Sequence, residues 1–109
     1  MLEQITITLP EMLQEDIPVE GNATNSGDLE YDKRVEEEIY NRLNQGDISA
    51  WFCAKVTASW KGLTGTDYLG CCNYLSLGDF MKKGGYYEDM KKNAYNELIK
   101  GIKALGSRL

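Results

Sequence analysis

Histidine is absent from this sequence, which excludes the chemistry that most often depends on it. The commonest general base, the commonest metal ligand and any histidine-based triad are all missing. Three cysteines remain, Cys53, Cys71 and Cys72, an odd number that does not suggest a disulfide framework. Cys71 and Cys72 are adjacent on an expected strand, so they point to opposite faces, and no fourth ligand completes a zinc site. We therefore predict reduced thiols, no metal and no cofactor.

Other signatures of catalysis are also missing. The glycines of Gly62–Gly65 and Gly84–Gly85 are not followed by the lysine and hydroxyl of a phosphate-binding loop. Glu88 and Asp89 are adjacent on an expected helix, so their carboxylates diverge and do not form an acid and base pair. We therefore expect a protein that is not an enzyme. The alternative is a cysteine-dependent enzyme, in which Lys55 lies on the same strand face as Cys53 and gives it a mildly electropositive setting.

Long hydrophobic runs are missing as well. The longest, Ile48 to Val56, is interrupted by Ser49 and Lys55 and is too short to span a bilayer. No basic run at the N-terminus resembles a secretory signal. We expect no association with membranes and a cytoplasmic location.

Strand patterns dominate the middle of the chain, whose 109 residues suit a single domain, 1–109. Alternating apolar side chains predict a strand over Trp51–Trp60. Two glycines within Lys61–Gly65 predict a hairpin turn to a second strand, Thr66–Leu75. Ile5–Leu9 alternates in the same way and supplies a third strand.

The second strand of this hairpin contains a glycine, Gly70. With regular alternation, Leu69 and Cys71 lie on one side and Tyr68 and Cys72 on the other. A glycine inside a strand also marks a bulge or a close backbone approach, so both arrangements stay open.

Helical spacing appears on both sides of the hairpin. Apolar residues every four positions predict a helix over Tyr31–Leu43, closed by Gly46 and capped by Asp28 or Ser26. Ser76–Lys83 predicts a short helix with Ser76 as its N-cap. The last helix has an apolar stripe of Tyr87, Met90, Ala94, Leu98, Ile102 and Leu105. Glu11–Ile17 forms at most one helical turn before Pro18.

The predicted fold class is α+β, a small antiparallel sheet of the central hairpin and the N-terminal strand, packed against two or three helices.

Charge is divided unevenly along the chain. Residues 1–48 hold twelve acids and three bases, net −9, and residues 49–109 hold five acids and nine bases, net +4. A flexible acidic loop is expected at about 18–30, because its composition is typical of loops. Acids at this density suit docking on a basic groove of a partner, and the alternative is a solvated helix face. The acids predicted to contact a partner are Glu30, Asp32, Glu36, Glu37 and Glu38.

Aromatic residues on the hairpin form a second candidate surface. Trp51, Tyr68 and Tyr74 lie on or beside the expected strands, together with Tyr86 and Tyr87. With helices on one side only, some of these side chains should stay near the surface, where aromatics are enriched at interface hot spots. We predict that Trp51, Tyr68 and Tyr74 bind a partner. Direct nucleic-acid binding is not expected, because Lys55 and Lys61 alone do not frame such a surface.

Several short runs of the sequence carry a resemblance. Trp51–Val56, Trp60–Gly62, Tyr68–Cys72 and Gly85–Met90 look like segments of small uncharacterised proteins carried by bacteriophages and mobile elements. The resemblance spans about half the chain and implies a bacterial or phage setting. Compact acidic proteins without active sites often act there by occupying a host factor, as anti-CRISPR and other anti-defence inhibitors do.

Two functions follow from these observations. The first is a non-enzymatic, phage-type binding protein that inhibits a host defence component through its acidic surface and exposed aromatics. The alternative is a binder of a small molecule or signalling nucleotide, a sponge, with a pocket of Trp51, Tyr68 and Tyr74 at an oligomer interface. Both are compatible with a homo-oligomer.

Overall fold

The central strand of the sheet is β3, Phe52–Trp60, in a computed structural model that describes residues 4–106. Its alternate residues from Phe52 to Ala58 are fully buried, as the sequence pattern predicts. β4, Leu63–Cys72, pairs with it antiparallel through a two-residue turn. Both turn residues, Lys61 and Gly62, have positive φ angles, 48° and 82°, which suit the tight turn of a twisted hairpin. The second strand therefore begins three residues earlier than predicted, because Leu63 and Thr64 already pair with β3.

The other edge of β3 is covered by two short strands. β1, Thr6–Ile7, and β2, Glu11–Gln14, both pair with β3 antiparallel, and the buried Pro10 lies between them. Proline has no N–H to donate to a ladder, so the edge is interrupted there. The predicted helical turn at Glu11–Ile17 is wrong, because pairing with β3 holds its first four residues in a strand and places Met12 against the core.

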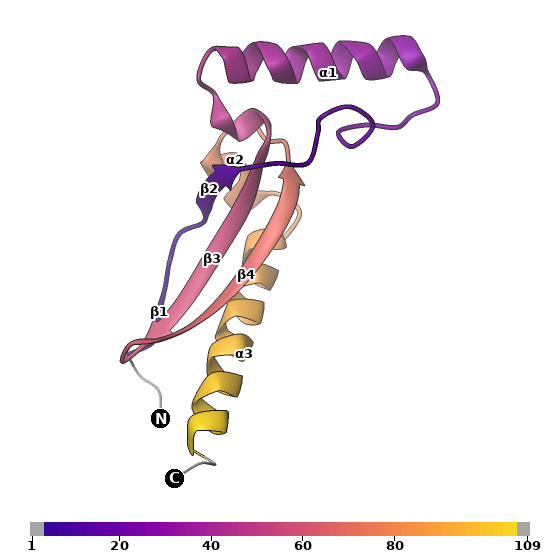
Figure 1. Ribbon diagram of the computed structural model, residues 1–109. Coiled ribbons are helices and arrows are strands. Elements are labelled where there is room, and N and C mark those ends of the chain that lie inside the picture. The colour runs from indigo at the N-terminus through magenta and orange to yellow at the C-terminus, as the bar shows by residue number, and fades with distance from the viewer. Residues whose placement is uncertain (1–3, 107–109) are drawn as a thin grey trace.

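One face of the sheet is covered by α3, Tyr86–Gly106, which runs along the hairpin of β3 and β4 (Figure 1). The first four residues of its predicted stripe, Tyr87 to Leu98, are buried against β3 and β4. The helix lies directly on Gly65, where a Cβ atom would come within 3.0 Å of backbone atoms of α3. α2, Leu77–Lys82, closes one end of this core with Phe80, and Ser76 caps it as predicted.

A β-bulge interrupts β4 opposite β3. The register shifts between Phe52 and Ala54, and Cys71 takes a positive φ of 55°. The Cys71 N–H donates to Oε2 of Glu15 at 2.8 Å, which holds the bulge. The extra residue places Cys72 in the main core and Cys71 in a second apolar cluster, so regular alternation is wrong here and Gly70 does accompany a bulge.

The second apolar cluster lies beyond the end of the sheet. It joins α1, Leu29–Asn44, to the 3₁₀ helix η1, Ile48–Ala50, through Val19, Ile39 and Trp51. α1 begins at Asp28, whose side chain accepts from the N–H groups of the first turn, so Asp28 and not Ser26 is the cap. The helix stands across the end of the sheet in Figure 1, and the molecule extends over 59 × 23 × 21 Å. The α+β fold class is confirmed.

The contact between Gly65 and α3 predicts the effect of two glycine substitutions. Gly65→Ala should lower the free energy of unfolding by about 3 kcal/mol, because backbone atoms cannot move aside for a methyl group. Gly101→Ala, in the same helix with nothing within 4 Å of the added Cβ, should raise it by about 0.5 to 1 kcal/mol. Urea unfolding of both variants measures the two effects. Equal effects would show that α3 does not lie on β4 as described.

Candidate functional site

The acidic end of the molecule consists of α1 and the loop of residues 15–28 that runs beneath it. Asp32 fastens the loop to the helix, because its carboxylate accepts from the Ser26 N–H at 3.2 Å and from the Ser26 hydroxyl at 2.7 Å. The Thr24 hydroxyl donates to the same carboxylate at 3.2 Å. The hydrogen bond from the Ser26 side chain is the main reason why the pKa of Asp32 lies below its ordinary value.

Two further contacts hold the loop against α1. The Gly21 N–H donates to Oε2 of Glu36 at 3.1 Å, and the Tyr40 hydroxyl donates to Glu20. The hydrogen bond from Tyr40 lowers the pKa of Glu20, and the same bond raises the pKa of Tyr40. The acidic loop expected to be flexible is therefore anchored to the helix at several points.

Arg42 joins this acidic end to the rest of the molecule. Its Nε lies 2.8 Å from Oδ2 of Asp47, and its Nη2 donates to the Ser49 hydroxyl and to the Tyr74 carbonyl. These partners belong to the last turn before β3 and to the chain after β4, so one side chain ties three segments together. Hydrogen bonds from Ser49, first, and from Arg42 lower the pKa of Asp47.

The exposed residues of α1 combine acidic, basic and apolar side chains. Leu29 is 83% exposed, and Tyr31 and Tyr40 are 47% and 40% exposed. Glu30, Glu37 and Glu38 are exposed on the same helix. Lys33 and Arg34 share a shallow groove with Glu30 and Glu37, so part of the acidic charge is balanced locally. This surface is preorganised, since the helix behind it is fixed on its other side.

The five predicted acids have different surroundings. Asp32 is buried and Glu36 is half-buried, and both accept hydrogen bonds from the loop. Glu30, Glu37 and Glu38 are exposed. The geometry therefore leaves these last three available for a partner, while Asp32 and Glu36 shape the surface from behind.

The three predicted aromatics do not come together. Trp51 is 5% exposed, and its Nε1 donates to the Ile17 carbonyl at 2.8 Å inside the second cluster. Tyr74 packs on Phe80 with ring centroids 5.0 Å apart at the end of the main core. Tyr68 is 55% exposed on the sheet, with the Lys55 Nζ 5.8 Å from its ring. Of the three, Tyr68 alone has a ring that is largely exposed to solvent, because the rings of Trp51 and Tyr74 are used in packing.

The sheet face opposite α3 is polar. It presents Thr6, Glu11, Leu13, Cys53, Lys55, Thr57, Ser59, Thr64, Thr66 and Tyr68. In the part of the chain that the structure describes, no helix covers this face (Figure 1).

The cysteines are not activated for nucleophilic attack. Burial, and then the Glu15 carboxylate, raises the pKa of both Cys53 and Cys71. Burial raises the pKa of Cys72 to about 11. The Glu15 carboxylate acts on the pKa of Cys53, and it is an anion where a cationic neighbour, Lys55, was expected. A raised pKa lowers the thiolate fraction at neutral pH, which is the opposite of what a catalytic cysteine needs.

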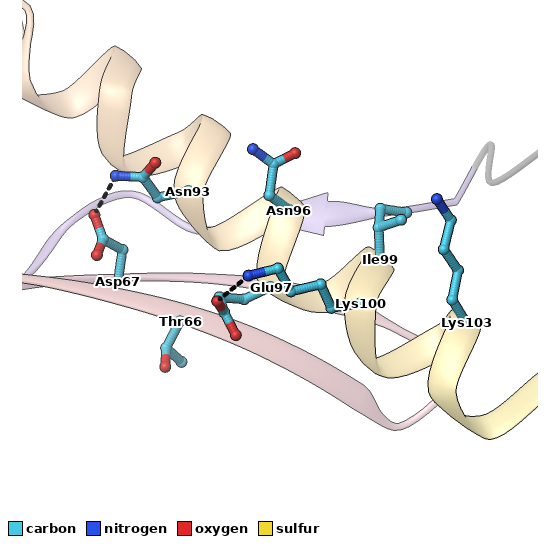
Figure 2. Close-up of a pocket in the computed structure, with 8 residues that line it drawn as sticks. All are labelled: Thr66, Asp67, Asn93, Asn96, Glu97, Ile99, Lys100 and Lys103. Atoms are coloured by element: carbon cyan, nitrogen blue, oxygen red, sulfur yellow. Dashed lines mark hydrogen bonds and ion pairs between the residues drawn. The ribbon is translucent and has the colours of Figure 1, made fainter.

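A groove runs between α3 and the free side of β4, with a volume of about 590 Å³. Figure 2 shows Asp67 of β4 facing polar side chains of α3, while the side chain of Thr66 points away from the helix. Asn93 donates to Asp67 at 3.1 Å, and Lys100 lies 3.5 Å from Glu97. The lining residues are Thr66, Asp67, Asn93, Asn96, Glu97, Ile99, Lys100 and Lys103.

The sequence interpretation missed this groove and the role of Arg42. A signal for the groove is present, because the polar residues of α3 that line it recur at steps of three and four, beside the apolar stripe. Which part of the sheet these polar residues face depends on where α3 lies on the sheet. No local pattern marks Arg42, whose partners lie up to 32 residues away.

The lowered pKa of Asp32 predicts a dependence of stability on pH. Its ionised form is favoured in the folded state, so it stabilises the protein above its ordinary pKa of 3.8, and this contribution disappears as the pH falls through the lowered value. Asp32→Asn should therefore lower the urea midpoint clearly at pH 6 and much less at pH 2.5. An equal difference at both pH values would show that the Asp32 charge does not support the loop.

Comparison of the chain with protein-family models, with curated proteins and with solved structures gives no match. Across residues 4–106, no helix is long and apolar enough to cross a membrane. Within the same range, no three cysteine or carboxylate side chains are grouped so that they could hold a metal ion. The likeness to phage and mobile-element proteins stays a prediction.

Proposed function

We propose that the protein is a non-enzymatic binding protein whose acidic end, α1 with residues 15–28, docks on a basic surface of a partner protein. One observation carries the proposal. A helix with exposed carboxylates and exposed apolar side chains stands beyond the end of the sheet, and hydrogen bonds through Asp32 and Glu36 fix the side turned inward. A surface ordered in this way loses little conformational entropy when a partner binds.

The charge of this end suits a basic partner. Residues 15–44 contain nine acids and three bases, a net charge of −6. Charge of one sign concentrated at one end of an elongated molecule accelerates association with a surface of opposite charge. The exposed side chains of Leu29 and Tyr31 supply apolar contact area on the same helix as these acids, and tyrosine is enriched among residues that dominate binding energy.

The proposed partner is a component of a bacterial defence system, and the proposed setting is the host cytoplasm. The resemblance to phage and mobile-element proteins implies this class of partner. The raised pKa values of the cysteines count against the alternative of a cysteine-dependent enzyme. The nucleotide sponge receives less support, because Trp51, Tyr68 and Tyr74 do not line a common pocket.

Charge reversal at matched positions tests the acidic end. Glu37→Lys combined with Glu38→Lys reverses two adjacent exposed carboxylates of α1, and Glu88→Lys combined with Asp89→Lys makes the same change on α3. In affinity capture from bacterial lysate, proteins recovered by the unmodified chain should be recovered about tenfold less by the α1 variant. The α3 variant should recover them as well as the unmodified chain does.

Thermal unfolding of both variants provides the control for folding, since all four positions are exposed. Recovery should also fall as the salt concentration rises from 0.05 to 0.5 M, because long-range attraction between charges is screened. Undiminished recovery by the α1 variant would remove the acidic end from the proposal.

A further inference from the structure

The two edges of the sheet are protected very differently. On one side, β3 is paired with two short strands separated by Pro10. Short edge strands and proline are devices by which natural sheets prevent pairing with another chain. On the other side, β4 is ten residues long and pairs only with β3 among the described residues. β4 contains no lysine, arginine or proline, and its one acid, Asp67, accepts from Asn93 of α3. Because the bulge at Cys71 lies at its far end, the regular part of this edge, residues 63–69, has none of these devices and is an open template for another strand.

The register identifies the backbone groups that point outward from this edge. The Thr8 N–H donates to the Thr57 carbonyl at 2.9 Å, and the Thr57 N–H donates to the Thr8 hydroxyl at 3.1 Å. The backbone of Thr57 therefore points away from β4, so its partner Thr66 also directs its N–H and C=O away from β3. By alternation, Thr64 and Tyr68 do the same.

The two ends of the long axis carry opposite charge. The acidic end, residues 15–44, has a net charge of −6. The other end consists of residues 57–66 with the hairpin turn and residues 98–106 of α3, which contain Lys61, Lys100 and Lys103 and no acid, although Glu97 lies 3.5 Å from Lys100. Lys100 and Lys103 line the groove beside β4. An antiparallel neighbour on β4 would set the acidic end of each molecule beside the basic end of the other.

We propose that β4 pairs antiparallel with β4 of a second copy of this chain, making one continuous sheet across a two-fold dimer. The outward groups of Thr64, Thr66 and Tyr68 supply the hydrogen bonds between the copies. The groove beside them suits an identical partner, because its two acids, Asp67 and Glu97, balance its two lysines. A surface that meets itself across a two-fold axis must be self-complementary, and opposite charges at opposite ends satisfy this. This interface lies apart from the acidic end proposed to bind a partner protein.

Sedimentation equilibrium of the full chain over a range of concentrations tests the pairing. The unmodified chain should approach twice its monomer mass as the concentration rises. Thr66→Pro removes one outward N–H and leaves the ladder with β3 intact, so it should weaken dimerisation at least tenfold. Circular dichroism checks that this variant folds. A monomer at all concentrations up to about 1 mM, or an unchanged dimer in Thr66→Pro, would overturn the proposal.

A pair of charge variants tests the same interface without touching the strand. Lys103→Glu lies in the groove, and Lys92→Glu makes the same change on the side of α3 that faces away from β4. We expect Lys103→Glu to weaken dimerisation by about fivefold and Lys92→Glu to leave it unchanged. If Thr66→Pro does not fold, this pair decides the question. Equal effects of the two lysine variants would overturn the placement of the second copy.

Discussion

The direct contact between Gly65 and the backbone of α3 is the constraint on which the rest of the structure depends. Because position 65 has no side chain, the helix approaches β4 more closely than any other residue would permit. This approach buries the stripe from Tyr87 to Leu98 against the sheet. It also fixes the polar side of α3 beside the free edge of β4, where the groove of Figure 2 lies. The packing of the core and the position of a candidate interface therefore share one cause.

The central strand β3 also organises the far end of the molecule. Trp51, just before the strand, is buried with Ile39 of α1, while Phe52 belongs to the main core. Arg42 bridges the same junction through Asp47 and the Tyr74 carbonyl. The acidic helix is therefore attached to the end of the sheet and does not cover its open face. This arrangement separates the acidic residues from the lysines of the second half of α3.

The two proposals make use of this separation in different ways. An acidic surface at one end attracts a basic partner, and opposite charges at the two ends favour an antiparallel neighbour along β4. Under both proposals together, a dimer carries two acidic helices at opposite ends of a continuous sheet. Such an arrangement binds a partner with two or more equivalent sites more tightly than one copy alone, because the second contact becomes intramolecular.

Local sequence determined the elements whose signals lie within a few residues of one another. The alternation of Phe52 to Ala58, the stripe that begins at Tyr87 and the cap at Ser76 follow from strand and helix periods and from local hydrogen bonds. Tertiary structure decided the rest. Glu11–Gln14 is a strand because of partners about forty residues away, Glu15 holds a bulge 56 residues away, and Trp51 is buried under Ile17 and α1. The burial of Asp32, in contrast to the exposure of Glu37 on another face of α1, depends likewise on where the loop crosses the helix. Such contacts depend on how distant segments pack, and a short stretch of sequence carries no record of them.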